Sequence, residues 1–158
     1  MRINKYKTLL NANGIPEVVR EEGKNYAELS NLSSPTRIAQ MFRTVFDLHR
    51  ETEEHAYLLC LNNKNHPIGV FEISHGTVNM SVLRPREVYM KALVIGATSI
   101  VLVHNHPSGD RTPSKEDRTS LKNMIAAGKM LGMPLLDSII LAGQDYYSFL
   151  EKERELFN

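Results

Sequence analysis

Three side chains that commonly bind transition metals lie close together in the second half of the sequence: His104, His106 and Asp117. Residues i and i+2 of a β-strand point to the same face, so a strand ending here would present both imidazoles to one ion. Two imidazoles and a carboxylate form a catalytic zinc set that leaves one coordination position open for water or substrate. The types and spacing therefore predict one zinc ion per chain, held by these three residues.

Each part of this pattern also has a simpler explanation. Two histidines separated by one residue often lie near a turn without binding anything. Ser114 and Asp117 are spaced as a helix-capping pair, because both can satisfy amide groups in the first turn of a helix. The metal prediction depends on the complete string from residue 104 to residue 117, in which each residue type falls where a metal site needs it.

The elements that would position these residues can be read from the flanking sequence. Residues 97–104 are continuously apolar and rich in β-branched side chains, which is typical of a buried strand. A loop rich in glycine and proline follows, and Ser114 begins a helix that ends near Gly132 and Pro134. Residues 135–141 predict a further buried strand. The two histidines are thus expected at the end of one strand, and Asp117 in the first turn of the next helix.

The rest of the chain alternates between helical and strand patterns. Ser34 and Pro35 begin a predicted helix that reaches about Arg50. Two apolar runs, 56–61 and 68–73, flank an Asn-rich turn and predict a β-hairpin, and a helix is expected from Pro85. Before them, residues 1–35 are predicted to form a short N-terminal arm that docks on the main domain, with a turn at 11–16 and a polar, helical segment at 17–29. The fold class expected is α/β, with a mixed sheet covered by helices.

Composition narrows the functional classes. With 158 residues, the chain fits one domain with a short arm. Cys60 is its only cysteine, so an internal disulfide and a zinc site with several thiolates are excluded. The formal net charge is +1, so no global basic field favours nucleic acid. No signal peptide is recognised, and no run approaches the ~20 apolar residues that span a bilayer. We therefore expect a cytoplasmic protein without a membrane partner.

The combined spacing resembles a known signature. His104-x-His106, seven residues, Ser114, two residues and Asp117 match the JAMM motif of the MPN (JAB) metalloprotease superfamily. The phrase His104-Asn105-His106-Pro107-Ser108-Gly109 is similar to the RadC branch of that superfamily, as are the pieces Gly76-Thr77 and Arg84-Pro85-Arg86-Glu87. The resemblance covers roughly residues 36 to 150.

This resemblance implies a fold, a cofactor and site residues. The fold would be an α/β sandwich like that of the cytidine deaminases, formed here by residues 36–158. One Zn²⁺ would be bound by His104, His106, Asp117 and a water. A glutamate just before the first central strand would act as general base, which selects Glu54, with Glu53 and Glu51 as close rivals. Ser114 would donate a hydrogen bond near the water or the oxyanion.

The function expected from the resemblance is hydrolysis of an amide bond in a peptide or protein, by a metallopeptidase or isopeptidase. The alternative is a DNA-associated accessory module, because the RadC name is linked to DNA repair. A nucleobase deaminase would need additional cysteines that the chain lacks. A metal-free scaffold conflicts with the complete ligand set. The histidines at 49, 55, 66 and 75 share no ligand spacing and are interpreted as surface or hydrogen-bonded residues, and the oligomeric state is left open.

Overall fold

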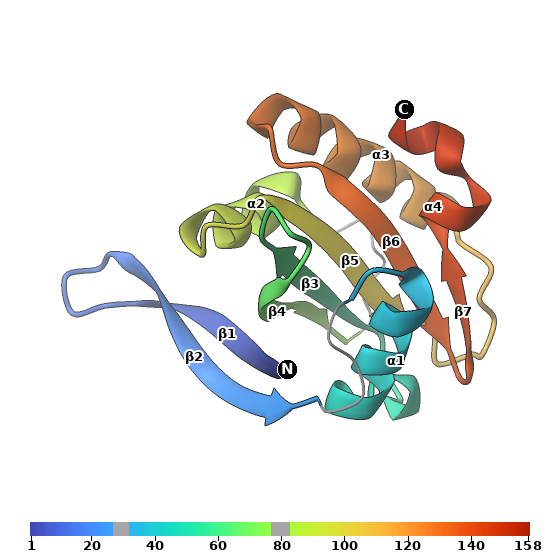
Figure 1. Cartoon of the computed structure of the whole chain (residues 1–158), viewed down its shortest axis with the longest axis horizontal. Coiled ribbons are helices and arrows are strands. Elements are labelled where there is room, and N and C mark those ends of the chain that lie inside the picture. The colour runs from blue at the N-terminus through green and yellow to red at the C-terminus, as the bar shows by residue number, and fades with distance from the viewer. Residues whose placement is uncertain (27–31, 77–82) are drawn as a thin grey trace.

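The computed structural model describes residues 1–26, 32–76 and 83–158. Its strands form one seven-stranded mixed sheet in the order β2-β1-β4-β3-β5-β6-β7, shown in Figure 1. The strands are β1 (Arg2–Leu10), β2 (Pro16–Asn25), β3 (His55–Leu61), β4 (Pro67–His75), β5 (Ser99–Asn105), β6 (Leu135–Ala142) and β7 (Asp145–Ser148). The α-helices in the described ranges are α1 (Pro35–Phe46), α2 (Pro85–Val94), α3 (Lys115–Leu131) and α4 (Phe149–Lys152).

Two hydrophobic clusters cover the two faces of this sheet. Alternate residues of β3 and β5, such as Leu58 and Leu102, pack in one cluster with α2 and α3. Their neighbours along the strands, such as Leu59 and Val103, pack in the other cluster with α1. Because both faces are covered, the central strands are apolar at almost every position. The predicted α/β sandwich with a mixed central sheet is confirmed.

The helix that carries Asp117 begins and ends where the sequence indicates. Ser114 is its N-cap, and a complete capping box links Ser114 and Asp117. Gly132 ends the helix with a left-handed φ of 65°, a conformation that glycine adopts without steric cost. These signals are local, so the position of Asp117 in the first turn is determined largely by its own sequence neighbours.

The N-terminal arm differs from the prediction in its secondary structure. The chain does turn within the predicted region 11–16, at residues 12–14, but Pro16–Asn25 form strand β2 and not a helix, while 27–29 lie outside the described residues. β2 pairs with β1 in an antiparallel hairpin that extends from the body in Figure 1. The valines and charged residues of this segment are compatible with a strand. The strand that pairs with it and stabilises it, β1, comes earlier in the sequence. The boundary between residues 35 and 36 remains a prediction.

The hairpin joins the main sheet through a short parallel contact. Lys5 and Tyr6 of β1 pair with Val70 and Phe71 of β4. A Cβ atom at Gly69 would lie 2.8 Å from the Tyr6 ring and 2.6 Å from Ile95, so only glycine permits this close approach. The arm is therefore part of the same sheet as the central strands.

Two other local expectations have definite outcomes. The predicted β-hairpin is confirmed as β3 and β4, and Asn65 adopts a left-handed φ of 56° in its turn. The helix expected to reach Arg50 ends earlier, because α1 stops at Phe46 and Asp47 adopts a left-handed conformation before a short 3-10 helix at Leu48–Arg50. Within the described ranges, none of the helices combines the length and apolar character that crossing a membrane requires.

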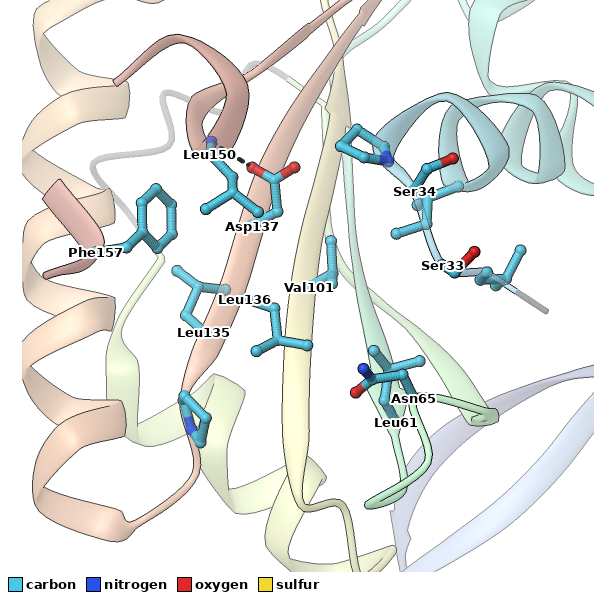
Figure 2. Close-up of a pocket in the computed structure, with 14 residues that line it drawn as sticks. Ser33, Ser34, Leu61, Asn65, Val101, Leu135, Leu136, Asp137, Leu150 and Phe157 are labelled. Atoms are coloured by element: carbon cyan, nitrogen blue, oxygen red, sulfur yellow. Dashed lines mark hydrogen bonds between the residues drawn. The ribbon is translucent and has the colours of Figure 1, made fainter. Parts of the chain in front are cut away.

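An apolar pocket of about 380 Å³ lies between α1 and β6, with Asp137 in its wall (Figure 2). Asp137 is buried and accepts hydrogen bonds from the Ser148 hydroxyl at 2.6 Å and from the Leu150 and Ser138 amides at 2.9 and 2.7 Å. Burial raises the pKa of Asp137 to about 6, although these hydrogen bonds act in the opposite direction. The carboxyl group thus links β6 to the end of β7 and the start of α4, but burial makes its charged form less favourable.

This cost predicts a pH dependence of stability. A carboxyl whose pKa is higher in the folded state binds its proton more tightly there, so its stabilising effect is present below about pH 4 and is lost as the pH rises through about 6. The amide side chain in Asp137→Asn does not titrate in this pH range, so the variant lacks this pH-dependent contribution to stability. Wild-type stability relative to this variant should therefore fall by up to about 3 kcal/mol between pH 4 and 7. Urea unfolding at several pH values measures the difference, and parallel profiles would contradict the assignment.

Candidate metal centre

The three predicted metal ligands lie together at one end of the central strands. His104 is near the end of β5, His106 follows that strand, and Asp117 is in the first turn of α3. The Nε2 atoms of the two histidines are 3.2 Å apart. Asp117 places Oδ1 3.4 Å from His104 Nε2 and Oδ2 3.7 Å from His106 Nε2. A strand tip and a helix start thus bring three donor atoms to one point.

These distances fit a single zinc ion. Bonds of about 2.0–2.2 Å in a tetrahedral site place neighbouring ligand atoms roughly 3.3–3.5 Å apart, so only small adjustments are needed. His104 and Asp117 are only 2% and 3% exposed, whereas His106 is partly exposed. The exposed side opens into a cavity of about 270 Å³ that is lined with polar side chains. The donor set is therefore preformed, with space for substrate on one side.

Hydrogen bonds orient both His106 and Asp117. His106 Nδ1 lies 2.7 Å from the Asp110 carbonyl, which can only accept, so Nδ1 carries the proton and Nε2 directs its lone pair to the site. The Ser114 amide and hydroxyl both donate to Asp117 Oδ2 at 2.7 Å, and Oδ1 is left facing His104. Metal-binding side chains usually have such outer partners, which hold them in the binding orientation.

The electrostatic environment keeps Asp117 ionised. Burial alone would raise its pKa, but the interactions with His104 and the hydrogen bonds from Ser114 outweigh burial and hold the pKa well below its usual range. An ionised carboxylate between two imidazoles is the form that a divalent cation needs.

Ser114 is at the edge of the same cavity and has a capping role. Its hydroxyl accepts a hydrogen bond from the Asp117 amide at 3.0 Å and donates to the Asp117 carboxylate. The capping interpretation and the metal interpretation of this pair are thus compatible, because Oδ2 accepts the capping hydrogen bonds while Oδ1 faces His104. In this arrangement Ser114 orients Asp117, and stabilising an oxyanion would require its hydroxyl to rotate.

The three glutamates considered as general base have different surroundings. Glu53 pairs with His75 at 3.0 Å, and Glu51 faces His55 at 3.6 Å. Glu54 instead lines the metal-centre cavity, together with His106, Ser114 and Asp117. The structure therefore brings Glu54 to the predicted site and directs its two rivals to other partners.

Asn105 was not among the residues predicted from the sequence. Its side chain accepts a hydrogen bond from the His55 amide at 2.7 Å and donates to the Glu53 carbonyl at 2.9 Å. These two backbone groups flank Glu54, so Asn105 connects the strand of the histidine ligands directly to the segment of the candidate base. A polar residue at the end of an otherwise apolar strand was the signal available in the sequence.

This connection can be tested by stability. Asn105 is 2% exposed, so Asn105→Ala would leave the His55 amide and the Glu53 carbonyl without their partner. We expect a loss of about 1–3 kcal/mol in the free energy of unfolding, measured by urea denaturation. Asn63→Ala, at an exposed turn position, is the matched control and should change stability by less than about 0.5 kcal/mol. Equal stabilities for the two variants would contradict the role of Asn105.

Comparison with known proteins identifies the family to which the chain is similar. Residues 32–156 match the family model of the RadC-like JAB domain. A UPF0758 protein of Pelobacter propionicus is 35% identical over 133 residues, which cover 84% of this chain and 57% of that protein. A UPF0758 protein of Staphylococcus haemolyticus is 39% identical over 134 residues, which cover 84% and 58% of the two chains.

The match covers most of this chain but only part of each relative. The chain spans somewhat more than half the length of the relatives named above, and their names state no activity. The family match itself includes all four candidate site positions from His104 to Asp117 as well as Glu54. The chain belongs to the RadC-like JAB domain family.

Proposed function

We propose that this chain is a zinc-dependent hydrolase that cleaves an amide bond in a peptide or protein. The observation that carries the proposal is the convergence of His104, His106 and Asp117 beside a cavity that Glu54 lines. Two imidazoles and a carboxylate are a donor set found in catalytic zinc sites. The family supports metal-dependent hydrolysis in general, and the amide substrate is our narrower inference.

Each residue has a separate task in the proposed reaction. A bound zinc ion would supply Lewis acidity, which lowers the pKa of water and polarises a carbonyl group. Glu54 would accept a proton from the attacking water and deliver it to the leaving amine. Ser114 would hold Asp117 in its ligand orientation, and Asn105 would hold the backbone on both sides of Glu54.

Metal content tests the ligand set without knowledge of the substrate. Purified wild-type protein should retain one zinc ion more per chain than His106→Ala after dialysis, measured by elemental analysis, because removal of one of three protein ligands leaves a weak site. His66→Ala is the control, since His66 is exposed and outside the cluster. Equal zinc content in wild type and His106→Ala would refute the metal centre.

The role of Glu54 is tested by separating metal binding from cleavage. Glu54→Gln should keep the zinc content of the wild type but cleave a synthetic peptide mixture about 10²–10⁴-fold more slowly, because it cannot accept a proton. Glu53→Gln is the matched control, since that side chain pairs with His75 and does not line the cavity. Peptide fragments are quantified by mass spectrometry with and without a chelator. Cleavage by Glu54→Gln at the wild-type rate would exclude Glu54 as the base.

A further inference from the structure

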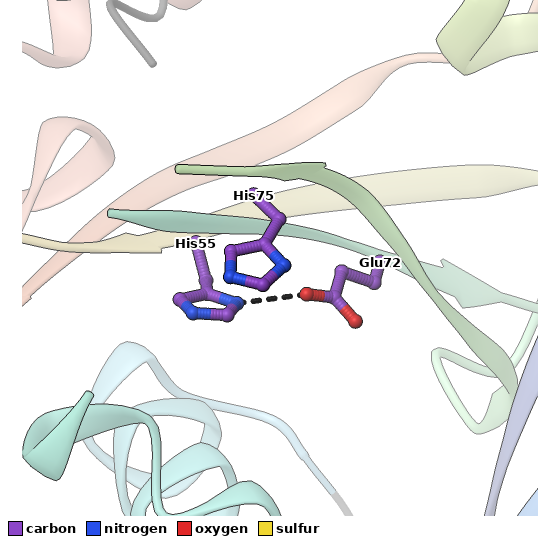
Figure 3. Close-up of side chains that lie close together, drawn as sticks. All are labelled: His55, Glu72 and His75. Atoms are coloured by element: carbon purple, nitrogen blue, oxygen red, sulfur yellow. Dashed lines mark hydrogen bonds and ion pairs between the residues drawn. The ribbon is translucent and has the colours of Figure 1, made fainter. Parts of the chain in front are cut away.

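We propose that His55, Glu72 and His75 form a second divalent-cation site, separate from the candidate metal centre and suited to a transition-metal ion such as Zn²⁺. Their ligand atoms all lie within 4.8 Å of one another. Figure 3 shows the three side chains gathered on one side of the β3–β4 pair. The sequence spacing of these histidines indicated surface or hydrogen-bonded residues, because the contact arises from strand pairing and not from a local motif.

The strand pairing explains how the three side chains meet. His55 and His75 are directly opposite each other in the antiparallel β3–β4 ladder. Glu72 is three residues before His75 and would face the other side of a regular strand. The register shifts between Ala56 and Tyr57, which leaves one extra residue in β4 and brings Glu72 to the side of the histidines. Bulges of this kind are a common means of redirecting a side chain next to a functional site.

The donor atoms of the three side chains lie close together. His55 Nδ1 is 2.7 Å from Glu72 Oε1. The two imidazole rings stack with centroids 4.1 Å apart, and Figure 3 shows a ring nitrogen of His75 on the side that faces Glu72. The other nitrogen of His75, Nε2, is already paired with Glu53 at 3.0 Å, so Nδ1 is the nitrogen that would bind the ion. The proposed ligands are thus Nδ1 of both histidines and Oε1 of Glu72.

Each proposed ligand also has an outer partner. Glu51 lies 3.6 Å from His55 Nε2, and Glu53 lies 3.0 Å from His75 Nε2. Lys5 donates to the second oxygen of Glu72 at 2.9 Å. A carboxylate that accepts from the distant nitrogen of a histidine is the usual second shell of a metal-binding imidazole. Here Glu53 lies at hydrogen-bond distance from His75 Nε2, whereas Glu51 is a more distant charged neighbour of His55 Nε2.

The charges of the group favour a divalent cation. Glu51, Glu53 and Glu72 carry three negative charges against the one positive charge of Lys5, which Glu21 also shares, so the group is negative when both imidazoles are neutral. One bound divalent ion would balance the group.

The surroundings of the His55 ring also favour a bound cation. Its side chain is only 9% exposed, and both of its ring nitrogens face carboxylates. A neutral imidazole has one donor and one acceptor nitrogen, so one lone pair faces a carboxylate oxygen unless the ring is doubly protonated or a metal ion intervenes. With an ion at Nδ1, the Nε2 proton would remain available to Glu51.

Binding requires His75 above all to move, because two stacked rings do not direct their lone pairs at one point. The His55–Glu72 contact would open by about 0.6 Å to reach the ligand spacing of a tetrahedral ion. The His75 side chain is 62% exposed and can rotate to aim its Nδ1 atom. The ion would reach the site from this exposed side.

Counting bound ions tests the proposal. Metal-free protein is titrated with Zn²⁺ by calorimetry and with Co²⁺ by absorption spectroscopy. We expect two ions per wild-type chain, one in His75→Ala, one in His106→Ala and none in the double variant. His66→Ala, which changes another exposed histidine, should still bind two ions. Because His75 is exposed, its replacement is not expected to disturb folding, and Glu72→Gln provides a second variant that should also lose one ion.

The two proposed sites give different results. If wild type and His75→Ala bind the same number of ions, or if His66→Ala loses an ion as His75→Ala does, the second site is refuted. If His75→Ala loses an ion while His106→Ala retains both, the second site is supported and the candidate metal centre fails. The proposal therefore stands or falls independently of the proposed hydrolysis.

Discussion

The antiparallel pairing of β3 with β5 determines where the groups of the candidate metal centre lie. The ladder places Ala56 opposite His104, so the residues just before β3 arrive beside the end of β5. Asn105 strengthens this junction with two buried hydrogen bonds to the backbone around Glu54. The histidines and the candidate base come from distant parts of the sequence, and this one strand pair gives them a common frame.

The helix α3 supplies the remaining ligand by a local device. A capping box defines the helix start, and the same carboxylate that closes the box is turned toward the histidines. Asp117 therefore contributes to the stability of the helix and to the donor set with different oxygens. This shared use explains why a capping signal and a metal-ligand signal coincide in the sequence.

The parts of the fold that could be predicted are those whose signals are local. The strand before His104, the helix from Ser114 and the hairpin turn at Asn65 each have turn or cap residues in the right places. The helical interpretation of the segment 17–29 was wrong over residues 17–25, because strand β2 depends on pairing with β1. The grouping of His55 with His75 was missed for a similar reason, since it results from strand register.

The attachment of the N-terminal hairpin has a consequence for work with shorter versions of this chain. Residues 32–156, which the family model matches, exclude β1 and β2. Without β1, the β4 backbone at Val70 and Phe71 would lose its parallel neighbour and become an open sheet edge. Glu72 would also lose the Lys5 ammonium that neutralises it. Open edges of apolar strands promote pairing between molecules, so the isolated family segment would tend to aggregate more than the complete chain, whose edge strand β2 is rich in charged residues.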